Sequence, residues 1–243
     1  CDELRAQHPS AQFRAFVDTA PLMEREIALL AGLGWIGKHT LLIHPRVGSF
    51  MLLGGVLTTL EVTKSSEPIA DHCGTCTRCI DACPTAAITP YSVDASRCIS
   101  YLTIENRGPI DPRFHDAMGD WLYGCDICQE VCPHNSPRPP ETEVGDINPE
   151  YTPKRASLPV LEVLNWSAED RQSAFAGTAM TRATLEMMKR NAVIFAANAI
   201  RRGRSEPDRS DLLLRLKELA SDHADSPELA SLAAAMLRRL NAE

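Results

Sequence analysis

The spacing of apolar residues predicts one short helix and two strands near the start of the chain. Residues 21–31 carry apolar side chains near one helical face, with Pro21 suited to the first turn and Gly32 to the end. Apolar runs over 39–44 and 49–60 predict two strands joined by a turn. Because the second run is almost continuous, we expect that strand to be buried on both faces.

Glycines interrupt this region at two places. The pair Gly54 and Gly55, within the second strand, is typical of a bulge or of a ligand lying against the backbone, and the residues alone favour neither. Gly32, Gly34 and Gly37 match G-x-G-x-x-G, but a dinucleotide site needs a strand before the glycines and a helix after them. The predicted order here is helix, glycines, strand, so we reject a dinucleotide site.

The last part of the chain is predicted to be helical. Residues 64–72 form a linker, and six prolines between 133 and 153 exclude regular structure there. Four helices follow, each preceded by a residue that favours the N-cap position, and the second of them runs to Arg202. These N-cap residues are Ser167, Thr181, Ser210 and Ser226.

The helical part also contains an internal repeat. The alanine-rich segment 196–202 aligns with 233–239 at an offset of 37 residues. Helices that recur at such a period are typical of HEAT-like arrays, which usually present a surface to a large partner.

Composition indicates a globular protein of 243 residues, 44% of them hydrophobic and 23% charged. No apolar run is long enough to span a bilayer, and no secretory segment is visible, so we expect a cytoplasmic protein with no membrane partner. The chain begins at Cys1 inside a helix-like stretch. We therefore expect an N-terminal portion to precede it, and Cys1 to be an ordinary thiol.

The net charge of −7 is unevenly distributed. Residues 1–150 carry 11 basic and 20 acidic side chains, whereas residues 151–243 carry 14 basic and 12 acidic ones. Within 171–204 there are seven basic residues and a single acidic one, Glu186. This difference predicts different partners for the two parts.

Eight of the nine cysteines lie between Cys73 and Cys132. The first run, from Cys73 to Pro84, is C-x2-C-x2-C-x3-C-P, the spacing of bacterial two-cluster ferredoxins. A second run ends in C-x2-C-x3-C-P with its first cysteine displaced to Cys98. In this pattern three cysteines bind one cluster and the fourth binds the other. The predicted ligand sets are Cys73, Cys76, Cys79 and Cys132 for cluster 1, and Cys83, Cys98, Cys125 and Cys128 for cluster 2.

Other uses of the cysteines are weaker explanations. Disulfides need an oxidising compartment, and zinc ribbons need neither the x2-x2-x3 spacing nor a proline after each last cysteine. We therefore predict two 4Fe–4S clusters, which could be structural, although two adjacent clusters more often conduct electrons.

Five segments together resemble the epoxyqueuosine reductase family. The resemblance runs from about Phe13 to the C-terminus, and it is specific because it joins a two-cluster run to a glycine-rich segment that ferredoxins lack. The segments are 16–21, 31–40, 48–54, 98–105 and 123–129.

The resemblance implies reduction of epoxyqueuosine to queuosine at the wobble position of tRNA anticodons, with cobalamin and two 4Fe–4S clusters. It also implies an α+β multidomain fold. Residues 1–64 would be the C-terminal part of a nitroreductase-like α/β cobalamin domain. Residues 65–140 would be a two-cluster ferredoxin-like domain, and 141–243 a linker and HEAT-like helices that bind tRNA. We further expect an external electron donor and a monomer.

Asp18 is the candidate proton donor for the departing epoxide oxygen. It lies between Val17 and Ala20-Pro21, where desolvation would raise the pKa of the carboxyl and keep it protonated. The competing interpretation is that Asp18 caps the helix that follows. The residues alone do not choose between the two roles, and the family resemblance favours the donor.

Two sets of binding residues complete the prediction. One set is nominated for cobalamin by analogy with the family and from where the backbone could approach a ligand. These residues are Asp18, His39, Thr40, Leu53, Gly54, Ser100, Cys125 and Asp126. Basic clusters supply phosphate contacts, although charge runs are usually solvated helix faces. The residues nominated for tRNA are Arg182, Lys189, Arg190, Arg201, Arg202 and Arg204.

Three other functions are consistent with part of the pattern. A cobalamin-dependent reductive dehalogenase would not need the basic helical region. A two-cluster electron carrier would need neither Asp18 nor the glycine-rich segment. A helical-repeat adaptor with structural clusters would not bind a corrin.

Overall fold

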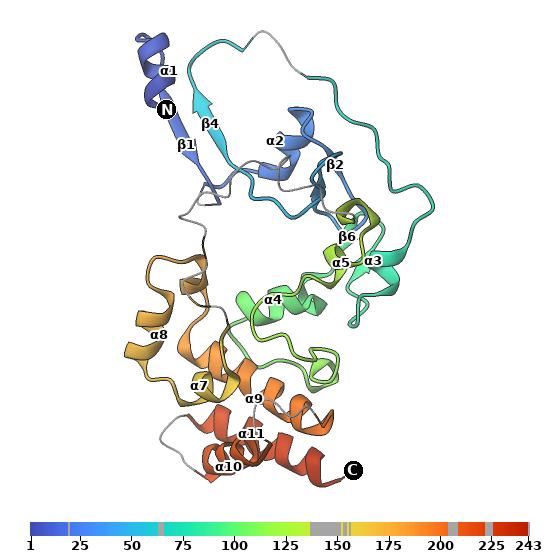
Figure 1. Ribbon diagram of the computed structural model, residues 1–243, viewed down its shortest axis with the longest axis vertical. Helices are drawn as coiled ribbons and strands as arrows, with labels where there is room; N and C mark the ends of the chain where they lie inside the picture. The colour runs from blue at the N-terminus through green and yellow to red at the C-terminus, as the bar shows by residue number, and fades with distance from the viewer. Residues whose placement is uncertain are drawn as a thin grey trace. The chain divides into compact units, whose positions relative to one another are not determined.

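A computed structural model of the protein describes residues 1–18, 20–62, 66–136, 152, 155, 157–203, 209–221 and 226–242 (Figure 1). Contacts divide the chain into two compact units. Unit 1 comprises Cys1–Cys83, Ile88–Val93 and Ile127–Asn148, and unit 2 comprises Pro84–Ala87, Asp94–Asp126 and Pro149–Glu243. The predicted cluster domain 65–140 therefore contributes to both units, and its division from its neighbours stays a prediction.

Unit 1 contains short strands paired two by two. Strand β1 pairs antiparallel with β4, with Phe13 opposite Thr58 and Phe16 opposite Gly55, and β2–β3 and β5–β6 form two further antiparallel pairs. Its elements are α1 (Asp2–Gln7), β1 (Phe13–Phe16), α2 (Glu24–Leu30), β2 (Trp35–Ile36), β3 (Leu42–Ile43), β4 (Gly55–Thr58), α3 (Arg78–Asp81), β5 (Ile88–Thr89), β6 (Ser92–Val93), α5 (Ile127–Glu130) and η3 (Pro133–Asn135).

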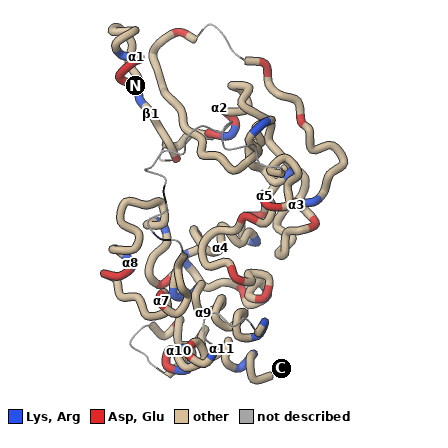
Figure 2. Tube along the Cα trace, in the orientation of Figure 1, with Lys and Arg blue, Asp and Glu red and all other residues tan. Residues whose placement is uncertain are grey.

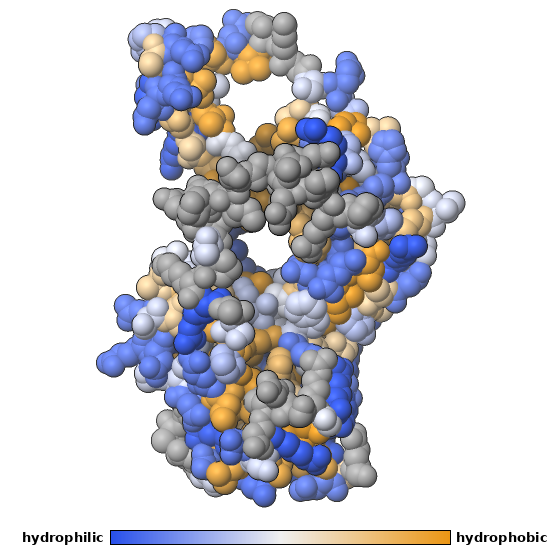
Figure 3. Space-filling view, in the orientation of Figure 1, coloured by the Kyte–Doolittle hydropathy of each residue, from blue (hydrophilic) through white to orange (hydrophobic). Residues whose placement is uncertain are grey.

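The predicted elements of this unit exist but are shorter than expected. Helix α2 begins at Glu24 rather than in the turn at Pro21, and it ends as expected at Gly32, whose φ is +69°. The predicted strand 49–60 reduces to β4. Its expected burial on both faces is wrong, because Val56 and Leu57 are 44% and 47% exposed. Figure 3 shows hydrophobic residues at the surface in this region.

Unit 2 is helical. Its elements are η1 (Ala95–Arg97), α4 (Ile99–Ile104), η2 (Pro112–Phe114), α7 (Val160–Asn165), α8 (Ala168–Phe175), η5 (Ala179–Arg182), α9 (Leu185–Arg201), α10 (Arg209–Ser221) and α11 (Pro227–Asn241). Helix α9 is central: α7, α10 and α11 pack on it, and its apolar residues dominate the largest core (Figure 1).

The predicted helix starts of unit 2 are partly correct. Ser167 forms a capping box with Asp170, and Ser226 caps α11, as expected. Thr181 belongs instead to the short η5, and α9 is capped by Thr184, whose hydroxyl accepts from the N–H of Met187. Ser210 lies within α10 rather than before it.

Polar side chains of α9 attach the 94–126 segment to this helical unit. Asn191 donates to the carbonyls of Thr103 and Leu122, and Asn198 donates to those of His115 and Gly119. These long-range bonds explain why the segment belongs to unit 2. Among the described residues, no helix combines the length and apolarity needed to cross a membrane.

Candidate cluster-binding and catalytic site

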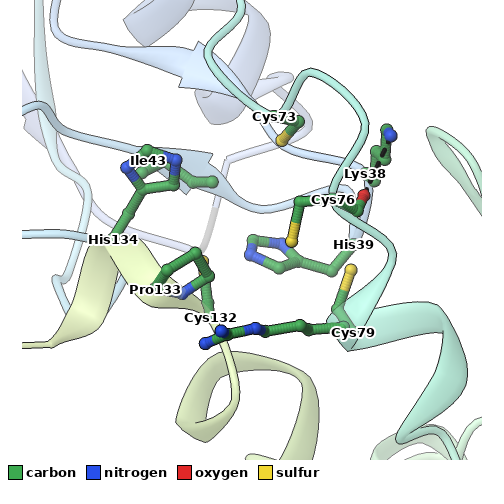
Figure 4. Close-up of a pocket in the computed structure, with 10 residues that line it drawn as sticks. Lys38, His39, Ile43, Cys73, Cys76, Cys79, Cys132, Pro133 and His134 are labelled. Carbon is green, nitrogen blue, oxygen red and sulfur yellow. Dashed lines mark hydrogen bonds between the residues drawn. The ribbon is translucent and has the colours of Figure 1, made fainter.

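Four of the eight clustered cysteines line a single cavity in unit 1. These are the residues predicted for cluster 1, and their neighbours in the cavity include Lys38, His39 and His134 (Figure 4). The cysteines come from distant parts of the sequence. Three lie in the loop leading into α3 and within α3, and the fourth follows α5: Cys73, Cys76, Cys79 and Cys132.

A lysine holds the first cysteine loop in place. Lys38 Nζ donates to the carbonyl oxygens of Gly74 at 2.7 Å and Cys76 at 2.9 Å. The backbone N–H of Cys73 also donates to Asp71 Oδ1 at 2.7 Å. The distant Lys38 and the neighbouring Asp71 thereby fix the backbone of the Cys73–Cys76 loop.

A buried polar network holds the segment that carries Cys132. Asn135 Oδ1 accepts from the N–H of Ser49 at 2.7 Å, and Asn135 Nδ2 donates to Ser49 Oγ at 2.9 Å and to the carbonyl of Gln129 at 2.8 Å. Gly48 makes room for it, since a Cβ there would lie 1.9 Å from Asn135 Oδ1. The turn after β3 is thus fastened to both sides of Cys132.

Burial raises the pKa of the Cys73, Cys79 and Cys132 thiols, and negative charge on neighbouring cysteines raises the pKa of Cys79 and Cys132 further. Several N–H groups oppose this change, including the backbone N–H of Lys38 at Cys73 and that of His134 at Cys132. Such thiolates repel one another unless cations lie between them, and bound metal deprotonates a coordinating thiol outright.

The arrangement fits an iron–sulfur cluster. In the described parts of the chain, no three Cys, His, Asp or Glu side chains converge closely enough to hold one metal ion. The four thiols instead surround a space in which each could bind a different iron of one cluster. One buried ring nitrogen beside the thiols, His39 Nε2, has no hydrogen-bond partner in the described structure. An orphaned nitrogen at this place accords with a group that brings its own hydrogen-bonding atoms.

The second predicted ligand set is divided between the units. Cys83 and Cys128 belong to unit 1, whereas Cys98 and Cys125 belong to unit 2. Cluster 2 therefore stays a prediction from spacing. Within unit 2, the N–H of Gly124, next to Cys125, donates to Thr103 Oγ1 at 3.0 Å.

Asp18 lies just beyond the end of β1, in an exposed position with φ of +51°. It does not cap the following helix, because the N-cap residue of α2 is Met23. The predicted desolvation is also not provided by the described neighbours, since Val17 is 55% exposed. The β1–β4 pairing brings this end of β1 to Gly54, where an added Cβ would lie 3.3 Å from Val17 Cγ2.

The residues nominated for cobalamin fall into three places. Asp18, Leu53 and Gly54 lie where β1 ends and β4 begins. His39 is buried and lines the cysteine cavity, and its predicted contact with the corrin stays a prediction. Thr40 follows it in the same turn, with φ of +68°. The nominees in unit 2, which stay predictions, are Ser100, Cys125 and Asp126.

The residues nominated for tRNA need one clear correction. Arg190 is 8% exposed, and its guanidinium donates to the carbonyls of Leu102, Asn106 and Gly108. It holds the chain after α4 and is not available to a phosphate. Lys189 is likewise buried, at 7% exposure.

The other basic nominees lie nearer the surface and form ion pairs. Arg182 pairs with Glu105 at 3.2 Å, Arg201 with Asp116 at 2.9 Å and Arg202 with Asp120 at 2.9 Å. Figure 2 shows basic and acidic residues together along the helices of unit 2. Arg204 lies outside the described residues.

Sequence reasoning does not find the supporting residues of the cavity. Lys38 reaches the cysteine loop across 36 residues, and Ser49 contacts Asn135 across 86, and such isolated long-range hydrogen bonds leave no periodic signal in the sequence. Gly48, followed by a serine in a turn, is the one hint that a backbone approaches closely there.

Comparisons with known proteins identify the type of domain that contains the cysteines. A family described as a 4Fe-4S double cluster binding domain matches residues 72–135, which include all eight clustered cysteines. Epoxyqueuosine reductase from Leadbetterella byssophila is 46% identical over 179 residues, covering 73% of this chain and 57% of the relative. That from Synechocystis is 44% identical over 193 residues, covering 78% of this chain and 65% of the relative.

The similar solved structures are also epoxyqueuosine reductases. A selenomethionine-labelled epoxyqueuosine reductase superposes with a TM-score of 0.85 at 30% identity, covering 98% of this chain and 60% of that one. An epoxyqueuosine reductase with an epoxyqueuosine-modified tRNA-Tyr stem loop gives 0.84 at 30% identity, with the same coverage. One from Bacillus subtilis, whose catalytic aspartate loop is swung out of the active site, gives 0.81 at 27% identity, covering 98% and 60%.

The chain spans between about half and two thirds of the length of these relatives. Similarity extends well beyond the cysteine runs into the glycine-rich segment and the helices, because the matched structures cover 98% of it. A shared two-cluster module alone would not produce such coverage. The chain belongs to the epoxyqueuosine reductase family.

Proposed function

We propose that the protein reduces epoxyqueuosine to queuosine in tRNA anticodons, with electrons passed through two 4Fe–4S clusters to cobalamin. The observation that carries the proposal is the cavity lined by four thiols. The cysteines that the spacing assigns to cluster 1 lie together there, in an arrangement that fits a cluster. The relatives that are 46% and 44% identical over most of this chain are epoxyqueuosine reductases.

The edge formed by β1 and β4 is our proposed cobalamin surface. Leu52 is 80% exposed and Val17 55% exposed, so apolar side chains stand uncovered beside Asp18 and Gly54. A surface of this kind, with a glycine that lets a ligand approach the backbone, fits a large flat cofactor. When bound, cobalamin would supply the low-valent cobalt chemistry that reduces a carbon–oxygen bond.

Asp18 is our proposed donor of the proton that the departing oxygen requires. Its left-handed backbone is a conformation that Asp tolerates better than most residues, and such residues gather at functional sites. The B. subtilis relative has a catalytic loop named for an aspartate, which supports this role. Because Asp18 is exposed among the described residues, we propose that cofactor and substrate complete its burial.

The tRNA is our proposed macromolecular partner, held by unit 2. Arg182 and Arg202 are the nominees with side chains about half exposed, at 50% and 43%. On binding, the two arginines would exchange their carboxylate partners for RNA phosphates. Neutralising the phosphates releases counterions from the RNA, so the affinity should depend on salt concentration. A relative solved with a tRNA stem loop supports this assignment.

The proposal is tested on the intact protein that carries this chain, reconstituted anaerobically with iron, sulfide and cobalamin. With a low-potential reductant and an epoxyqueuosine-containing anticodon stem loop, we expect about eight irons bound, a corrin spectrum, and conversion of the modified nucleoside to queuosine. Omitting cobalamin should abolish conversion. Bound clusters and corrin without any conversion would overturn the proposed substrate.

Two cysteine variants test the ligand assignment in the same assay. Cys98→Ala should remove one cluster and stop turnover, whereas Cys1→Ala should change neither, because Cys1 is exposed and outside the runs. Retention of both clusters in Cys98→Ala would show that the predicted set is wrong.

A further inference from the structure

His39 is a buried polar side chain in the cluster 1 cavity that is not a predicted ligand and whose hydrogen bonding is incomplete. It is 3% exposed and lies in the turn between β2 and β3. In Figure 4 its ring lies among the side chains of Cys76, Cys79 and Cys132.

The hydrogen bonding of the ring fixes the position of its proton. The backbone N–H of Leu41 donates to His39 Nδ1 at 3.2 Å. An Nδ1 that accepts has no hydrogen, so in the neutral ring the hydrogen is on Nε2. His39 is therefore a donor through Nε2.

That donor has no acceptor in the described part of the chain. Nε2 is fully buried and has no hydrogen-bond partner there. Because an unsatisfied buried donor is costly, nearly all such groups in native proteins have partners. An acceptor that the cavity receives would satisfy this donor, and the group that fits four thiols is a cluster with inorganic and cysteine sulfurs.

The turn is built to hold the ring in this position. A Cβ at Gly37 would lie 3.1 Å from His39 Cε1, so a larger residue would press on the ring. Thr40 has φ of +68°, an unusual conformation for a β-branched residue. Lys38 is anchored on both sides, by its side chain to Gly74 and Cys76 and by its carbonyl to the N–H of Tyr91.

We infer that His39 Nε2–H donates a hydrogen bond to a sulfur of cluster 1 and thereby raises the reduction potential of that cluster. The inference rests on the proposed cluster at this ligand set. Reduction adds one negative charge, so a donor stabilises the reduced cluster more than the oxidised one. Hydrogen bonds to the sulfurs are among the protein's means of setting cluster potentials.

The effect is measured by redox titration of the reconstituted intact protein, followed by EPR of the reduced clusters. His39→Leu removes the donor and keeps an apolar side chain in the cavity. We expect one cluster to become harder to reduce by about tenfold in its equilibrium constant, which is about 59 mV for one electron. The other cluster should keep its potential and serves as the internal reference.

His134→Leu is the matched control, because His134 lines the same cavity but its ring has no orphaned buried nitrogen. An equal shift in both variants would mean that any lost imidazole alters the cavity, and would overturn the inference. An unchanged potential in His39→Leu with full iron content would also overturn it. Iron content separates these outcomes from failure of the proposed cluster itself.

A second measurement covers the case in which His39→Leu does not assemble a cluster. Protein with ¹⁵N-labelled histidines should show coupling of a histidine nitrogen to the spin of the reduced cluster in pulsed EPR. His39→Gln, which retains a donor, should assemble the cluster and lose that coupling, whereas His134→Gln should keep it. Coupling that is absent in the wild type, or that persists in His39→Gln, would refute the hydrogen bond.

Discussion

At the scale of single residues, buried polar side chains explain why charge in the sequence is a poor guide to binding surfaces. Arg190 belongs to the stretch with the highest density of basic residues, yet its guanidinium donates hydrogen bonds to three backbone carbonyls. Burial lowers the pKa of Arg190 to about 10, so it remains charged at neutral pH. The charge is satisfied inside unit 2 and has a structural role.

Arg190→Met should therefore destabilise the fold. It leaves three carbonyls around a buried position without their donor, at about 1–3 kcal/mol for each group that finds no water. We expect a loss of about 3 kcal/mol or more in the free energy of unfolding, measured by urea denaturation followed by circular dichroism.

Arg182→Met is the matched comparison, because its pair with Glu105 is half exposed and such pairs contribute about 0–1 kcal/mol. This variant should keep its stability but bind tRNA more weakly, with a salt slope reduced by about 1. Equal stability of the two variants would contradict the structural role of Arg190.

At the scale of elements, short turns do more than strands to build the cysteine cavity. The turn after β3 ends at Gly48, whose φ of +74° and close contact with Asn135 leave room for no side chain. Through Asn135 this turn is joined to the segment after Cys132. The cavity therefore depends on a contact between residues 48 and 135, which are remote in sequence.

Gly48→Ala should weaken retention of cluster 1. The new methyl group would displace Asn135 and break its bonds to Ser49. Gly203→Ala has a comparable backbone cost, with φ of +67°, but an added Cβ there meets nothing within 4 Å. We expect faster iron loss to a chelator in Gly48→Ala only, and equal rates in both variants would contradict this account.

The sequence predicts local features of these elements better than their extent. The caps at Ser167 and Ser226 and the glycine end of α2 depend on neighbouring residues, and they are confirmed. The strand over 49–60 is wrong in length and burial, because apolar periodicity cannot distinguish a core strand from an apolar surface. Likewise, the spacing of cysteines predicts the four that share a cavity, but not the lysine and asparagine that position them.

At the scale of the whole molecule, the cysteine region belongs to both units. The segment 94–126 joins the helices because α9 donates from Arg190, Asn191 and Asn198 to its carbonyls. Those donors lie 80 or so residues further along the chain, beyond the boundary at residue 140, which stays a prediction. A composition change marks the proline-rich linker, but contacts decide which segments fold together.

Asp18→Asn tests the proposed chemistry of the whole protein. The change preserves the shape of the side chain and removes the acidic proton, and Asn tolerates the left-handed backbone at this position as well as Asp does. Asp18 caps no helix at α2, so the fold should not depend on its charge. We therefore expect normal expression, cluster and corrin spectra, and tRNA affinity.

Turnover should nevertheless fall by roughly 10²–10⁴, the usual contribution of a positioned general acid. The measurement is single-turnover conversion of epoxyqueuosine in a stem loop by the intact protein, with Glu26→Gln as the control, because Glu26 is an exposed carboxylate in the first turn of α2. The loss should appear in the single-turnover rate constant at saturating stem loop and not in the affinity for the stem loop, because a proton donor acts after binding. An Asp18→Asn protein that turns over at the wild-type rate would exclude Asp18 as the donor and leave water or the tRNA itself as the source of the proton.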